Sequence, residues 1–127
     1  IYNFLWYGFQ MIKVGICGFG TVGQSLVKHL SDHKDFIIKK TSLEFEIAYI
    51  ADRSIHKKTY PKNINVTTDV MSLANPGKVD ILVELIGDVK LTYPLIKNAI
   101  ENSGKKSNSS TLNSPITPME LLKVFNQ

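Results

Sequence analysis

Three glycines with the spacing G-x-G-x-x-G make the segment of the chain best suited to bind a ligand. They follow an apolar run and lead into a helical pattern, the context in which this spacing predicts dinucleotide binding. The first glycine allows a tight turn, the second lets a pyrophosphate approach the backbone, and the third lets the helix pack closely on a sheet. Amides at the start of that helix then bind phosphate oxygens. The alternative is a glycine-rich turn with a purely structural role. The predicted cofactor-binding residues here are Gly18, Phe19, Gly20, Thr21, Val22 and Gly23.

Two charged residues follow the second apolar run and could recognise the adenosine half of a dinucleotide. Asp52 lies farther beyond Gly23 than the usual spacing of about 20 residues, which we attribute to a polar loop at 34–43. Its carboxylate could accept both ribose hydroxyls of NAD. Arg53 could instead hold the 2′-phosphate of NADP, or be a solvated loop arginine. The pair leaves the choice between NAD and NADP open.

The other reactive side chains do not form a recognisable catalytic or metal site. Glu84 lies in an apolar strand, where a carboxylate is costly unless it is hydrogen-bonded, so a structural and a direct role both remain open. Cys17 is expected to be a small core residue rather than a nucleophile. The histidines have no further ligands at metal-binding spacing and are interpreted as surface or loop residues. They are His29, His33 and His56.

Strands and helices alternate along the chain. Apolar, β-forming stretches predict strands at 12–17, 45–51, 64–66 and 79–86. A helical pattern begins at Thr21, a short helix capped by Asp69 is expected to run through Leu73, and another helix covers 91–102. This alternation predicts an α/β fold, a Rossmann-like doubly wound parallel sheet in a single domain, with 12–17 between 45–51 and 79–86. Ile86 and Gly87 come at the carboxyl end of the last of these strands, where open α/β sheets bind ligands.

Composition is that of an ordinary globular domain. The chain has 127 residues, of which 43% are hydrophobic and 20% charged. A net charge of +4 suits an anionic ligand, but no lysine- or arginine-rich block predicts nucleic-acid binding. No apolar run is long enough to predict a membrane span. A single cysteine, which cannot form an internal disulfide, indicates a reducing compartment, so we expect a cytoplasmic protein.

The two ends of the chain differ from its centre in composition and in hydrophobic pattern. Residues 1–10 are aromatic and without a clear period, so we expect an upstream or disordered segment before a natural start at Met11. Residues 11–102 are the predicted dinucleotide-binding domain. Residues 103–127 are expected to be a polar, serine-rich linker followed by a short helix that starts at Thr117-Pro118, together a non-native tail.

The segments MIKVGICGFGTVGQSLVKHL, IAYIADRS, TTDV and VDILVELIG resemble the N-terminal domain of homoserine dehydrogenase. Enzymes of this family use NAD or NADP to interconvert aspartate 4-semialdehyde and homoserine, on the way to threonine and methionine. The resemblance implies that residues 18–23 contact the pyrophosphate and that Arg53 meets the adenosine ribose or its phosphate. It also implies that Ile86 and Gly87 lie near the nicotinamide half.

The chain also departs from the family pattern. Asp88 stands where a second glycine usually follows V-E-L-I-G, and the family's T-A-N-K segment does not follow Lys105. The substrate domain and the surface through which family members form homo-oligomers are also absent, so the fold is incomplete relative to the family. We therefore expect this polypeptide alone to be inactive. The alternatives to an enzyme's cofactor domain are a non-catalytic dinucleotide-binding module and an inactive truncated product.

Overall fold

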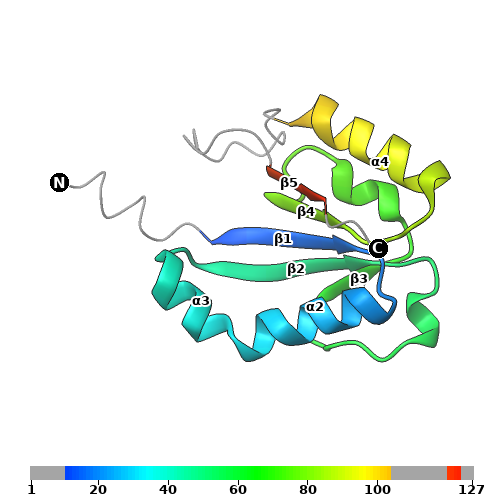
Figure 1. The fold of residues 1–127 in the computed structure, drawn as a ribbon. Coiled ribbons are helices and arrows are strands. Elements are labelled where there is room, and N and C mark those ends of the chain that lie inside the picture. Colours follow the sequence, from blue (N-terminus) through cyan, green and yellow to red (C-terminus); the bar gives the residue numbers. More distant parts are fainter. Residues whose placement is uncertain (1–10, 104–119, 124–127) are drawn as a thin grey trace.

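The computed structural model describes residues 11–103 and the backbone of residues 120–123. The described strands form one parallel sheet of five strands, in the order β3-β2-β1-β4-β5 (Figure 1). The predicted central position of 12–17 is confirmed, because this strand pairs with β2 on one side and β4 on the other. The strands are β1 (Ile12–Cys17), β2 (Phe45–Ala51), β3 (Asn65–Thr67), β4 (Ile81–Glu84) and β5 (Glu120–Lys123).

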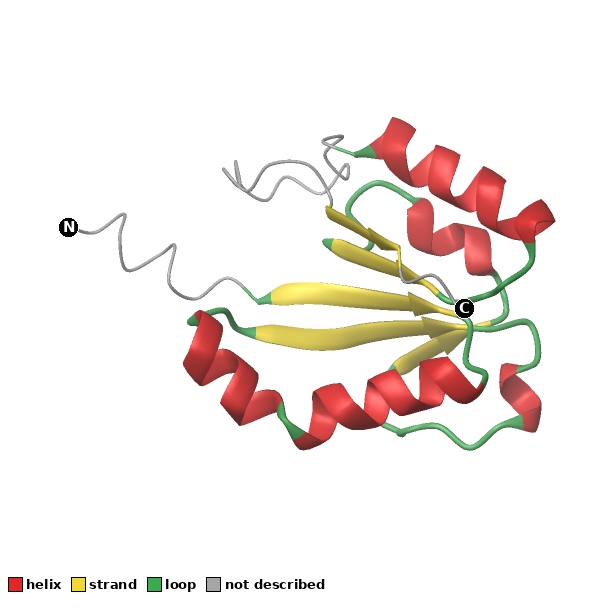
Figure 2. Cartoon of the chain, in the orientation of Figure 1, coloured by secondary structure: helices red, strands yellow, loops and turns green. Residues whose placement is uncertain are grey.

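Helices cover both faces of this sheet (Figure 2), which confirms the doubly wound α/β prediction. One face carries the helices α2 (Thr21–Asp32) and α3 (Lys34–Thr41). The other face carries α4 (Val89–Asn102) and the 3₁₀ turn η2 (Val70–Ala74), while a second 3₁₀ turn, η1 (Ile55–Lys57), follows β2. No helix in the described part of the chain is long and apolar enough to cross a membrane.

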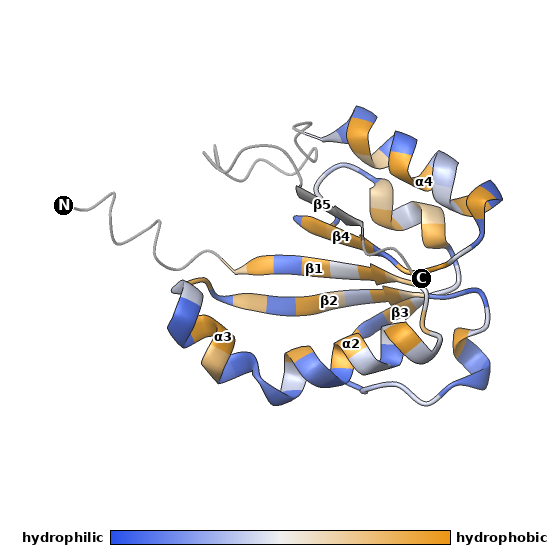
Figure 3. Ribbon diagram, in the orientation of Figure 1, coloured by the Kyte–Doolittle hydropathy of each residue, from blue (hydrophilic) through white to orange (hydrophobic). Residues whose placement is uncertain are grey.

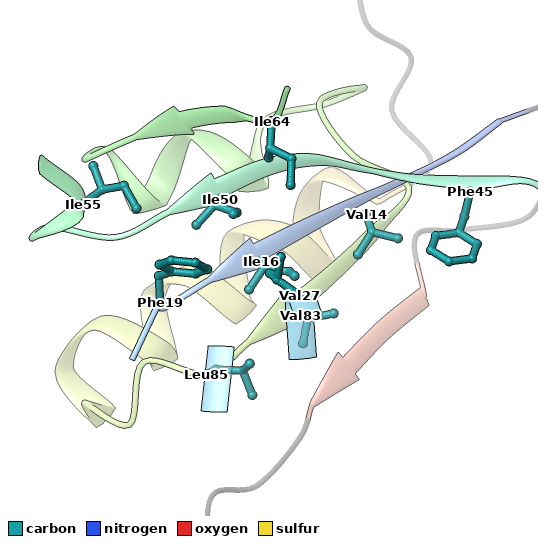
Figure 4. Packing of buried hydrophobic residues seen from close by; sticks show 10 residues of the cluster. All are labelled: Val14, Ile16, Phe19, Val27, Phe45, Ile50, Ile55, Ile64, Val83 and Leu85. Atoms are coloured by element: carbon teal, nitrogen blue, oxygen red, sulfur yellow. The ribbon is translucent and has the colours of Figure 1, made fainter. Parts of the chain in front are cut away.

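Each face of the sheet has its own hydrophobic core, and successive strand residues alternate between the two. In β4, Val83 packs in the core under α2, whereas Leu82 packs in the core under α4. In β2, Ile50 packs in the core under α2 and Ala51 packs in the core under α4. Because most of both faces is buried, the central strands are mainly apolar, and the hydrophilic bands on β1 and β2 (Figure 3) include the exposed Lys13 and Glu46. The first of these cores also contains Phe19 (Figure 4).

The expected loop at 34–43 is wrong, because most of it forms α3. Ile37 and Ile38 pack against the core under α2, so the segment has an apolar side to bury. Asp35 lies in the first turn of α3, where a carboxylate interacts favourably with the helix dipole. The long interval between Gly23 and Asp52 is thus a second helix rather than a loop.

Polar side chains explain where two elements near β4 begin and end. The strand is shorter than the predicted 79–86, and at its end the Glu84 carboxylate accepts the Ile86 amide at 2.6 Å. The helix predicted at 91–102 begins earlier, at Val89, because the Asp88 carboxylate caps it by accepting the Lys90 amide at 3.0 Å. The strand predicted at 64–66 is displaced by one residue. The short helix begins after Asp69 as predicted, but ends one residue later than expected, at Ala74.

The short helix expected from Thr117-Pro118 is wrong over Glu120–Lys123, where the chain forms β5 beside β4. A strand at this position pairs main-chain N–H and C=O groups of β4, which a helix cannot do. The rest of the predicted helix, the polar segment from 104 and residues 1–10 lie outside the described residues.

Candidate functional site

A cleft of about 410 Å³ opens at the carboxyl end of the parallel strands. Its walls come from the turn after β1, the loops after β2 and β4, and the first turns of α2 and α4. Ligands of open α/β sheets bind at this edge. The structure brings most of the predicted site residues together here: Gly18, Gly20, Thr21, Val22, Gly23, Asp52, Arg53 and Ile86.

The three glycines of the turn have different roles. Gly18 has φ of +100°, and a Cβ there would lie 2.7 Å from the Leu85 carbonyl oxygen. A Cβ on Gly23 would overlap the Gly18 carbonyl oxygen. The fold itself therefore requires these two glycines. A Cβ on Gly20 would meet nothing within 4 Å, so its missing side chain leaves open space for a ligand.

The start of α2 is equipped to bind an anion. Gly20 is its N-cap, no side chain caps the helix, and no acidic residue lies in its first turn. The amides of the first turn have no acceptor within the helix, and the positive end of the helix dipole faces the cleft. The start of α4 differs, because Asp88 supplies its own negative charge there. Phosphate therefore fits the beginning of α2.

Phe19 and Gly87 are the predicted residues that do not line the cleft. The Phe19 side chain is buried in the core under α2 (Figure 4). Its backbone amide donates to a carboxylate oxygen of Asp52 at 2.7 Å. Gly87 has φ of +77°, a conformation that favours glycine, in the loop that leads from β4 to α4.

The Asp52 carboxylate is surrounded by donors from its own chain. Oδ2 accepts the Phe19 amide at 2.7 Å and the Lys58 ammonium at 2.9 Å, and Oδ1 accepts the Ser54 amide at 2.7 Å. Burial opposes ionisation of Asp52, but these hydrogen bonds outweigh it and hold the pKa of the carboxyl below its usual value. Sequence reasoning missed Lys58, because nothing in its polar loop marks it as a cleft residue.

Arg53 lines the cleft and pairs with Asp88. Nη2 of Arg53 lies 3.7 Å from Oδ2 of Asp88, and both side chains are substantially exposed. The sequence placed both residues at strand ends but did not predict their contact. The remaining lining residues that it missed are Ser54, Val70, Leu85 and Leu91.

Glu84 and Cys17 have structural roles. Glu84 is buried, and its carboxylate accepts the amide of Ile86, so it shapes the loop after β4. Cys17 pairs with it in the sheet register. Burial, followed by the negative charge of Glu84, raises the pKa of the Cys17 thiol to about 12. Such a thiol stays protonated and is not a nucleophile, which agrees with the expected core role.

None of the cleft-lining residues is a histidine. The rings of His29 and His33 stack with their centroids 4.3 Å apart at the end of α2, and His56 is exposed in η1. Among the described residues, no group of three histidine, cysteine or carboxylate side chains could hold a metal ion.

Residues 18–106 match the model of the homoserine dehydrogenase NAD-binding domain family. The chain belongs to this family. The homoserine dehydrogenase of Pseudomonas aeruginosa is 36% identical over 91 residues, which cover 72% of this chain and 21% of that protein. The Bacillus subtilis homoserine dehydrogenase is 31% identical over 96 residues, covering 73% and 22%.

Solved structures of homoserine dehydrogenases share the fold. The Staphylococcus aureus enzyme at pH 7.0 superposes with a TM-score of 0.65 at 28% identity, over 76% of this chain and 25% of that one. The Thiobacillus denitrificans enzyme has a TM-score of 0.63 at 30% identity, over 73% and 22%. The chain thus spans about a fifth of the length of the curated relatives, and the part it shares with the family is the NAD-binding domain.

Proposed function

We propose that this chain supplies the dinucleotide-binding site of a homoserine dehydrogenase, an oxidoreductase that interconverts aspartate 4-semialdehyde and homoserine. The open space at Gly20 beside the uncapped start of α2 is the observation that carries the proposal. A nicotinamide cofactor bound there supplies hydride transfer, and the protein supplies position and electrostatics.

The proposed contacts follow the arrangement of the cleft. The amides of Thr21, Val22 and Gly23 bind the pyrophosphate, with Gly20 leaving it room to approach. Ile86 and Gly87, in the loop after β4, lie on the nicotinamide side, and Arg53 lies on the adenosine side.

NAD is the proposed preferred cofactor. A 2′-phosphate would require a cation on the adenosine side, and Arg53 is already paired with Asp88. Binding of NADP therefore competes with this ion pair of the folded chain, whereas NAD has no 2′-phosphate that needs Arg53.

The wider role follows from the proposed reaction. Homoserine lies on the route to threonine and methionine, and a cytoplasmic location agrees with an unpaired, buried Cys17. Subunit contacts of the family are proposed to lie outside the segment that this chain shares with its relatives.

Calorimetric titration of the 127-residue chain with NAD, NADP and ADP tests the proposal. Gly20→Val should lower dinucleotide affinity at least about 100-fold, because its side chain occupies the space that a pyrophosphate needs. Its thermal stability should stay close to wild type, since that space is empty in the fold. Ser31→Val, which is exposed at the far end of α2, is the matched control and should bind normally. Unchanged affinity in Gly20→Val would reject the turn as the site.

A further inference from the structure

The carboxylate of Asp52 holds the glycine turn in place. Its Oδ2 accepts the backbone amide of Phe19, thirty-three positions earlier in the chain, at 2.7 Å. The amide of Gly18, one residue before, donates to the Ala51 carbonyl at 2.8 Å. The end of β2 therefore anchors two consecutive amides of the turn, immediately before the residue that opens α2.

The same carboxylate fixes a cation at the wall of the cleft. Lys58 donates from Nζ to Oδ2 of Asp52 at 2.9 Å, and the Lys58 side chain is only 26% exposed. An ammonium has three donors, so contact with Asp52 leaves Lys58 able to bind an anion as well. Lys58 is held beside the turn, where phosphate is proposed to bind.

These contacts limit what Asp52 can offer to a ribose. Two donors already engage Oδ2, and the Ser54 amide engages Oδ1 at 2.7 Å. The side chain is 12% exposed. A carboxylate that accepts two ribose hydroxyls commonly uses both of its oxygens. The two donors on Oδ2 fill its lone pairs, so Asp52 can offer that oxygen to a ribose only by releasing either the Phe19 amide or Lys58.

We propose that Asp52 is a positioning residue: it orients the phosphate-binding turn and Lys58, and does not read the adenosine ribose. This rests on the proposed dinucleotide site. Small errors in the orientation of a binding loop weaken binding strongly, so removal of Asp52 should weaken phosphate binding although Asp52 does not touch the phosphate.

Titration with ADP and with 2′,3′-dideoxy-ADP separates the two roles. Asp52→Ala should lower the affinity for both ligands by the same factor, about tenfold or more, because a charge-assisted anchor of the turn is lost. If Asp52 reads the ribose, Asp52→Ala will instead leave the dideoxy ligand unaffected and abolish the preference for ADP, which would overturn the proposal.

Controls keep the test decisive. Glu44→Ala removes an exposed carboxylate just before β2, at the opposite end of that strand from Asp52, and should leave both affinities unchanged. Asp52→Asn keeps a carbonyl that can accept one backbone amide, so it should fold and recover part of the lost affinity for both ligands.

Hydrogen exchange of the Phe19 amide tests the positioning role without a ligand. The exchange rate should rise in Asp52→Ala and return part of the way to the wild-type rate in Asp52→Asn. Unchanged Phe19 exchange would overturn the positioning role, whereas failure of the wild-type chain to bind ADP, NAD or NADP would overturn the dinucleotide proposal instead.

Discussion

Arg53 and Asp88 face each other across the end of β1, with Nη2 of the arginine 3.7 Å from Oδ2 of the aspartate. Arg53 follows β2 and Asp88 precedes α4, so the ion pair connects loops from the two strands that flank β1. Because both side chains are exposed, solvent screens the pair and little free energy is needed to open it. It is therefore suited to bias ligand choice without blocking the cleft.

Asp88→Asn should favour NADP. The substitution removes the negative charge that engages Arg53, yet asparagine can still cap the Lys90 amide at the start of α4. We expect NADP affinity to rise about two- to fivefold relative to NAD, the scale of an exposed ion pair. Calorimetric titration with both dinucleotides measures the ratio. Glu44→Gln makes the same change in net charge just before β2, at the end of the strand away from the cleft. An equal gain for NAD and NADP, or the same gain in Glu44→Gln, would count against a role for the pair.

Alanine substitutions at the three glycines of the turn should differ in their effect on the stability of the fold. Gly18→Ala and Gly23→Ala should each lower the free energy of unfolding by about 1–3 kcal/mol, since a Cβ meets backbone oxygen at both positions. Gly20→Ala should change it by less than about 0.5 kcal/mol, because Gly20 has φ of −80° and open space around it. Urea denaturation followed by circular dichroism measures all three. A Gly20→Ala variant as unstable as Gly23→Ala would show that the space beside Gly20 is not open in solution.

Much of this site could be predicted because its signals are local. The spacing of Gly18, Gly20 and Gly23 encodes a turn between a strand and a helix, whatever lies elsewhere in the chain. Beyond Lys13 and Glu46, the runs 12–17 and 45–51 carry apolar residues on both faces, and a parallel sheet is the arrangement that buries them. Strand order and the cleft follow from that topology.

The contacts that depend on tertiary packing could not be predicted. The hydrogen bond from Phe19 to Asp52 joins two loops only after β1 and β2 pair in register, and no sequence spacing specifies it. Lys58 enters the cleft through the path of η1, which has no strong pattern of its own. The helix α3 was not predicted, because charged residues at both ends of the segment indicate a loop. Only the folded chain shows that its two isoleucines pack against the core.

Asp52 should stabilise the fold near neutral pH and cease to do so in acid. Hydrogen bonds hold its folded pKa below the usual value of 3.8. A carboxyl with a lower pKa in the folded state stabilises the fold above its unfolded pKa, and this contribution is lost as the pH falls through 3.8 and then through the folded pKa. Urea denaturation of wild type and Asp52→Asn should therefore give free energies of unfolding that differ most near neutrality and converge below about pH 4.

Asp32 provides the comparison for that titration. Its pKa is also lowered, first by the hydrogen bond from Lys28, but this pair is exposed on α2 and screened by solvent. Asp32→Asn should differ little from wild type at any pH. If wild type keeps the same excess in free energy of unfolding over Asp52→Asn in acid, the negative charge of Asp52 is not the cause. The shape of the side chain would then explain its contribution.

The 127-residue chain should bind a dinucleotide without turning over homoserine. Its described site offers phosphate-binding amides and two cations, whereas hydride transfer also needs a substrate carbon held against the nicotinamide and a positioned acid or base. Loss of positioning alone forfeits about 7 kcal/mol, or roughly five orders of magnitude in rate. A spectrophotometric assay of NADH formation, with homoserine and NAD in excess, should therefore stay at background, and Gly20→Val should give the same trace. Turnover well above background that disappears in Gly20→Val would show that this chain carries its own substrate-positioning groups, and that the shared fifth of the relatives is an enzyme in its own right.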